Sequence, residues 1–208
     1  MPDKRGYDYN KEEWQRAVDF HGHVCPGLAQ GFRASKAALQ ALGVSRAEDE
    51  ELVAIVENDA CGVDAVQVLT GCTAGKGNLI LRDYGKQVFI FARRGQGKGI
   101  RVYVHGGKEE PNPEYMSLRN KIDRGVATEE ERARFYSLHL QRVEDLLTRP
   151  AEDIMVLKEV DVCLPEKARI FPSVECAECG EKVGEMRARV KNGKPVCLAC
   201  ADSYERRW

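Results

Sequence analysis

The first 43 residues carry apolar and polar positions in a helical period. Residues 10–20 follow Asn10, a favoured N-cap residue, and predict a first helix. Pro26 suits the first turn of a second helix, and Gly43 suits its end. The expected buried face of this second helix, over 26–42, is lined by Leu28, Phe32, Ala34, Ala37, Ala38, Leu39 and Leu42.

The middle of the chain changes to the pattern of β-strands. The run LVAIVEN at 52–58 is β-branched and apolar without alternation, which is typical of a buried strand. Residues 59–71 predict a turn into a short helix, and a glycine-rich loop follows at 71–78. KQVFIFARR and GIRVYVHGG, joined by a GQGKG turn, predict an antiparallel hairpin over 86–107. DIMVLKEVDV at 153–162 is expected to form a last strand.

A helical period returns after residue 110. Thr128 and Glu131 have the spacing of a capping box. The core stripe that follows consists of Phe135, Leu138, Val143, Leu146 and Leu147. Residues 163–173 contain two prolines and are expected to form a linker. The pattern therefore predicts two domains, an α+β domain over 1–165 and a small second domain over 166–208.

Composition excludes several classes of protein. The 208 residues are 43% hydrophobic and 31% charged with a formal net charge of −1, as in ordinary globular proteins without a global attraction for nucleic acid. The first ten residues carry charges and no apolar run, so we expect no secretory signal. The longest apolar stretches, such as 88–92, are too short to span a bilayer. Eight cysteines in such a chain predict a reducing cytoplasm, where thiols serve metals or catalysis.

Four of these cysteines lie near the C-terminus in the pattern C-x2-C-x17-C-x2-C. This spacing is typical of a structural zinc site formed by Cys176, Cys179, Cys197 and Cys200. The alternatives are two disulfides or a redox pair. Residues 174–208 hold seven basic and six acidic side chains, so four thiolates and one Zn²⁺ leave a net charge of −1. Such a module is a poor phosphate binder, and nucleic-acid binding is not expected.

A second group of potential ligands lies in the first third of the chain. His21, His23 and Cys25 alternate at a spacing of two, which places them on one side of an extended segment. Cys25 precedes a helix, where free backbone N–H groups and the helix dipole favour a thiolate. Cys61 also lies between a strand and a helix, and Cys72 follows in a loop that can approach it. These five residues are the expected active site, binding a metal or acting through a thiolate.

The remaining candidates favour simpler interpretations. Isolated cysteines are usually small buried hydrophobic residues, which is the reading preferred for Cys163 and equally open for Cys61 and Cys72. We expect His105 and His139 to be ordinary structural or surface residues. Neither glycine-rich loop predicts a nucleotide site, because GCTAGKGN lacks the Walker spacing and RGQGKG lacks a following helix.

Three motifs in this order resemble the FmdE-like family, named for the FmdE component of formylmethanofuran dehydrogenase. They are FHGHVCPG at 20–27, ENDACGVDAVQ at 57–67, and TGCTAGKGNL with DYGK at 70–79 and 83–86. The resemblance covers about residues 14–165. The later segment CAECGE…KPVCLACA is similar to the treble-clef zinc finger that some members carry.

The resemblance implies a thioredoxin-like α+β core, with a mixed sheet of about five strands flanked by helices. It further implies an active site built from His21, His23, Cys25, Cys61 and Cys72, which holds zinc in some members, and a homodimer. Every one of these motif positions is filled in this sequence.

The family name reflects association with a molybdenum or tungsten enzyme. The expected function is therefore a zinc protein with a His/Cys site linked to formylmethanofuran dehydrogenase-type redox metabolism. The alternative is a non-catalytic accessory or assembly partner of a molybdenum or tungsten oxidoreductase, with the finger as its interaction module. Zinc is expected at the four-cysteine site, with room for a second metal at the N-terminal site.

Overall fold

The computed structural model describes residues 9–107 and 112–203. The chain divides into two compact units, Met1–Glu166 and Lys167–Trp208. The first eight residues, which contributed to the argument against a secretory signal, lie outside the described residues. None of the described helices combines the length and the apolar character that a membrane crossing requires.

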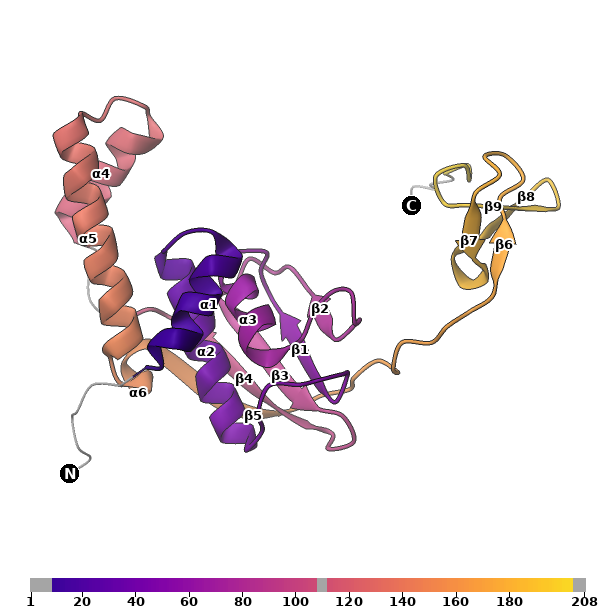
Figure 1. Cartoon of the computed structure of the whole chain (residues 1–208), viewed down its shortest axis with the longest axis horizontal. Helices are drawn as coiled ribbons and strands as arrows, with labels where there is room; N and C mark the ends of the chain where they lie inside the picture. Colours follow the sequence, from indigo (N-terminus) through magenta and orange to yellow (C-terminus); the bar gives the residue numbers. More distant parts are fainter. Residues whose placement is uncertain (1–8, 108–111, 204–208) are drawn as a thin grey trace, which may run out of the picture. The chain divides into compact units, whose positions relative to one another are not determined.

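The first unit contains a five-stranded sheet with the order β2-β1-β3-β4-β5 (Figure 1). Its strands are β1 (Leu52–Val56), β2 (Leu79–Leu81), β3 (Val88–Arg93), β4 (Lys98–Val104) and β5 (Met155–Asp161). β1 and β2 are parallel and the other neighbours are antiparallel. The expected mixed sheet and α+β fold class are therefore confirmed.

β1 and the β3–β4 hairpin form the centre of this sheet. Every residue of β1 is buried, as its unalternating apolar sequence predicts. In the hairpin register, Phe91 lies opposite Ala54 on one side and Ile100 on the other. Gly95 and Gly97 have positive φ in the hairpin turn, which few residues with a side chain adopt. β2 has only three residues and was not predicted as a strand.

Three helices cover one face of the sheet: α1 (Lys11–His21), α2 (Pro26–Leu42) and α3 (Gly62–Thr70). α2 and α3 pack on the strands, while α1 packs against both helices (Figure 1). The predicted caps of α1 and α2 are present. The Asn10 side chain accepts a hydrogen bond from a backbone N–H of the first turn of α1, and Gly43 ends α2 with φ of 62°.

α2 and α3 approach each other most closely at two glycines. A Cβ atom added to Gly31 would lie 2.1 Å from the carbonyl oxygen of Gly62. The obstacle is backbone, which cannot rotate away as a side chain can. This crossing brings the N-terminal ends of the two helices together, and with them Cys25 and Cys61.

We expect Gly31→Ala to lower the free energy of unfolding of the first unit by about 3 kcal/mol, because the added methyl group forces the helices apart. Urea unfolding measures this loss. Gly75→Ala is the matched control, since a Cβ there meets nothing within 4 Å. Equal stability of the two variants would contradict the close helix crossing.

The remaining helices of the first unit are α4 (Pro113–Asp123), α5 (Glu129–Thr148) and α6 (Ala151–Ile154). The capping box at Thr128 and Glu131 is present. The predicted stripe of α5 divides between two cores. Its first part, Phe135 and Leu138, packs with Tyr115 and Leu118 of α4, whereas Val143, Leu146 and Leu147 join the main core.

The second unit consists of two small hairpins and one 3₁₀ turn. Its elements are β6 (Ser173–Glu175), β7 (Lys182–Gly184), η1 (Glu185–Arg187), β8 (Arg189–Lys191) and β9 (Lys194–Val196). β6 pairs with β7, and β8 pairs with β9. Asn192 and Gly193 both have positive φ in the β8–β9 turn, the conformation that an Asn-Gly hairpin turn favours.

Two candidate metal centres

The four C-terminal cysteines converge in the second unit. Cys176 follows β6 and Cys197 follows β9, and each begins a tight turn that presents the second cysteine of its pair, Cys179 or Cys200. Their sulfur atoms all lie within 4.8 Å of one another. Cys179 Sγ and Cys197 Sγ are 4.0 Å apart, close to the ~3.8 Å edge of a tetrahedron with Zn–S bonds of about 2.3 Å. The geometry fits a closed structural zinc site.

The acidity of these thiols explains why the site needs a cation. Backbone N–H groups of Cys179, Cys197 and Glu178 lower the pKa of Cys176 to about 6. A hydrogen bond with Cys197 and burial raise the pKa of Cys200 to about 12. The first thiolate therefore forms readily, whereas the last forms only when a positive charge is present. A divalent ion supplies that charge.

The second cluster lies where three helix ends of the first unit meet. His21 is the last residue of α1, Cys25 is the N-cap of α2, Cys61 is the N-cap of α3, and His23 lies between α1 and α2. One ligand atom from each of these four residues lies within 4.8 Å of the others. The structure thus brings together four of the five expected active-site residues.

The two sulfur atoms of this cluster point at the same small space. A Cβ atom added to Gly27 would lie 3.8 Å from Cys61 Sγ and 3.9 Å from Cys25 Sγ. His21 Nε2 lies 3.7 Å from Cys25 Sγ, near the ligand spacing of a tetrahedral site. Two thiols and two imidazoles are ligands that zinc favours, so the donor set fits this metal.

The environment of Cys25 has two opposing effects on its thiol. As predicted, Cys25 caps α2, and its sulfur accepts a hydrogen bond from Leu28 N at 3.3 Å. Burial nevertheless raises the pKa of Cys25 to about 11, despite the lowering by the backbone N–H groups of Leu28 and Gly27, and nearby Cys61 raises it too. The expectation of a low-pKa thiolate at this N-cap is therefore wrong, because loss of water outweighs the helix end.

The two histidines have different surroundings. The His21 side chain is 10% exposed, and its Nδ1 lies 2.7 Å from Asp64 Oδ2. His23 is exposed, and its ring lies 4.3 Å from the His21 ring, centre to centre. Asp64 did not emerge from the sequence reasoning, although it lies three residues after Cys61 in the motif ENDACGVDAVQ. This helical spacing is the signal that could have identified it.

Two other cysteines differ from their expected places. Cys72 is fully buried, its thiol donates to the Leu52 carbonyl oxygen at 3.4 Å, and it is not part of the His/Cys cluster. Its expected approach to Cys61 is thus not observed, because the loop inserts this side chain into the core. Cys163 is exposed, so the expectation of a buried thiol there is wrong. His139 contacts Tyr115 through its Nδ1 at 3.0 Å, as a structural histidine would.

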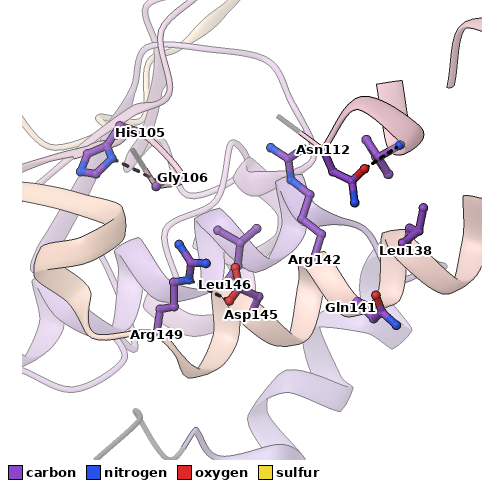
Figure 2. A pocket seen from close by; sticks show the side chains of 11 residues that line it. His105, Gly106, Asn112, Leu138, Gln141, Arg142, Asp145, Leu146 and Arg149 are labelled. Atoms are coloured by element: carbon purple, nitrogen blue, oxygen red, sulfur yellow. Dashed lines mark hydrogen bonds and ion pairs between the residues drawn. The ribbon is translucent and has the colours of Figure 1, made fainter. Parts of the chain in front are cut away.

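A cavity of about 490 Å³ lies along α5, opposite His105 and Gly106 (Figure 2). Its charged groups are engaged with neighbours: Arg149 pairs with Asp145 at 2.7 Å, and Arg142 lies over the Tyr115 ring. None of the four clustered His and Cys residues lines this cavity. The two candidate metal centres therefore do not depend on it.

Known proteins resemble the whole chain. It is 40% identical over 196 residues to a protein of Archaeoglobus fulgidus described as a "Probable S-adenosyl-L-methionine-binding protein", a match that covers 91% of this chain and 52% of that one. The chain thus spans about half the length of this relative. The crystal structure of an FmdE-like protein of tungsten formylmethanofuran dehydrogenase, from Syntrophus aciditrophicus, matches with 26% identity, a TM-score of 0.60 and 96% coverage of both chains.

Two family descriptions match separate parts of the sequence. The family described as "FmdE, Molybdenum formylmethanofuran dehydrogenase operon" matches residues 20–156, which include the His/Cys cluster. The "Prokaryotic dksA/traR C4-type zinc finger" matches residues 169–206, which include the four-cysteine cluster. The chain belongs to the FmdE family and carries a C4-type zinc finger.

Proposed function

We propose that this protein carries a reactive zinc centre at His21, His23, Cys25 and Cys61, in addition to the structural zinc of its finger. The observation that supports the centre most strongly is the convergence of these four side chains, from three helix ends, within 4.8 Å. Helix ends are rigid, so the ligands are held in place before metal arrives.

The two centres differ in the property that separates structural from reactive metal sites. The finger has four sulfur ligands, which close a tetrahedral site. In the N-terminal cluster one ligand, His23, is exposed and can leave to admit a substrate or water. A bound zinc ion would supply Lewis acidity, polarising a carbonyl oxygen or lowering the pKa of water. His23, once displaced, can accept or donate a proton beside the reacting group.

We further propose that this centre acts within formylmethanofuran dehydrogenase-type redox metabolism, together with a molybdenum or tungsten oxidoreductase. The description of the FmdE family, which names the operon of such an enzyme, supports this link. A thioredoxin-like core, a treble-clef arrangement of the finger and a homodimer belong to the same proposal. Eight free thiols favour the reducing cytoplasm. An accessory role, the alternative, would require no intact His/Cys centre.

Metal content tests the N-terminal centre directly. The full-length protein is expected to bind two zinc ions per chain, and Cys61→Ser is expected to bind one, because a serine hydroxyl is a much weaker zinc ligand than a thiolate. Metal analysis after equilibration with zinc and gel filtration measures this. Cys72→Ser is the matched control, since Cys72 lies outside the cluster, and it should retain two.

A parent protein with one zinc ion would overturn the proposed function, as would a Cys61→Ser variant that keeps both. Loss of one ion in Cys72→Ser, with the finger intact, would return Cys72 to the site and contradict the observed cluster.

A further inference from the structure

Helix α3 presents two polar side chains on the same face as Cys61. Asp64 and Gln67 follow it at spacings of three and six, which places the three residues along one side of a helix. Asp64 Oδ2 lies 2.7 Å from His21 Nδ1, and Asp64 Oδ1 accepts a hydrogen bond from Gln67 Nε2 at 3.2 Å. Both carboxylate oxygens of Asp64 are thus engaged, one with His21 and the other with Gln67.

The contact between His21 and Asp64 determines which nitrogen of His21 is free. An ionised carboxylate only accepts hydrogen bonds, so Nδ1 must donate its proton to Asp64. In the neutral imidazole the lone pair then lies on Nε2. Nε2 is the nitrogen that lies 3.7 Å from Cys25 Sγ, toward the centre of the cluster.

We propose that Asp64 is a positioning residue of the N-terminal centre, which holds His21 as the Nδ1–H tautomer and makes Nε2 a permanent ligand. Gln67 holds the carboxylate in the orientation that reaches His21. In the described part of the chain, no carboxylate makes such a hydrogen bond to His23. His21 is therefore the fixed imidazole and His23 the exchangeable one, an assignment that rests on the proposed metal centre.

The two bonds also explain why His21 can serve this role at the end of α1. A histidine at a helix terminus has rotational freedom unless a second contact restrains it, and Asp64 is a 35% exposed side chain on a different helix. Carboxylates that hydrogen-bond to the second nitrogen of a ligating histidine fix its orientation and increase its basicity. Their loss typically lowers metal affinity about 10- to 100-fold.

The first test measures zinc affinity of the N-terminal centre in the full-length protein whose finger is already loaded. Asp64→Ala is expected to weaken binding about 10- to 100-fold. Asp64→Asn should weaken it less, because the amide oxygen still accepts from Nδ1. The control is Asp19→Asn, which removes an equal charge two residues before His21, from a carboxylate bonded only to Gln15 in the described structure. It should leave the affinity unchanged.

The second test reads the tautomer without metal at the centre. Nitrogen-15 NMR of the imidazole rings, at a pH where they are neutral, should show His21 protonated on Nδ1 in the parent and on a mixture of nitrogens in Asp64→Ala. Circular dichroism confirms that both variants are folded. A role in folding alone would not move this signal.

The possible results separate the two claims. A parent His21 protonated on Nε2, or unchanged zinc affinity in Asp64→Ala, overturns the assignment of Asp64. An Asp19→Asn variant as weak as Asp64→Ala also overturns it, because local charge would then be the cause. A parent that binds no second zinc ion overturns the proposed function instead, even when the NMR signal shows the Nδ1–H tautomer.

Discussion

Cys197→Ser is expected to unfold the second unit while the first unit stays folded. Among the described residues of this unit only Cys176 and Val196 are buried, and each of its strands has three residues. Such a core cannot hold a fold of about 40 residues without a staple. Structural zinc supplies about 10–16 kcal/mol in comparable modules, and the loss of one thiolate removes most of it.

Hydrogen exchange followed by mass spectrometry is the appropriate measurement for this variant. Backbone amides of β6 to β9 should lose their protection, and metal analysis should show the loss of one zinc ion. Cys163→Ser provides the control, because Cys163 is an exposed thiol of the first unit. Retained protection at Val196 in the Cys197→Ser variant would mean that the hairpins fold without metal, and the structural role of the zinc would be lost.

Arg33→Met is expected to lower the free energy of unfolding of the first unit by about 3–5 kcal/mol. Arg33 is 2% exposed in the middle of α2. Its guanidinium donates hydrogen bonds to the carbonyl oxygens of Leu146, Leu147 and Arg149, each at 2.8 Å. These carbonyls end α5, where helix geometry leaves them without partners and the helix dipole favours a cation. Methionine fills similar space but leaves all three buried carbonyls unsatisfied.

Urea unfolding followed by circular dichroism measures this loss, because all six described α-helices belong to the first unit. Arg33→Lys should lose less, since lysine keeps the charge but cannot reach three carbonyls with one fork. Arg93→Met serves as the control for an exposed arginine of the same unit. A loss below about 1 kcal/mol in Arg33→Met would show that water or other groups satisfy the end of α5.

The local elements of the first unit were predictable from sequence because their signals are local. Asn10, Pro26 and Gly43 mark the ends of α1 and α2, and the capping box at Thr128 and Glu131 marks the start of α5. β2 escaped prediction because three residues are too few for a periodic signal. The division of the α5 stripe between two cores also escaped, since periodicity shows which face is buried but not which partner covers it.

The candidate site was predictable to the level of its ligands. His21, His23, Cys25 and Cys61 were identified from residue type and from their places beside helix starts. Cys72 had a similar sequence context, yet its side chain enters the core and meets Leu52. Which thiols share a pocket depends on how α2 and α3 cross at Gly31 and Gly62, and no local pattern reports that crossing.

The sequence by itself determined the finger, because four cysteines at fixed spacing need only one ion and two short turns to meet. It also determined most helices and strands through caps and periodicity. Only the tertiary structure decided the buried charge of Arg33, whose acceptors lie more than 110 residues away, and the contact of Asp64 with His21. These side chains pair across different helices, and packing in three dimensions alone sets the distances between such groups.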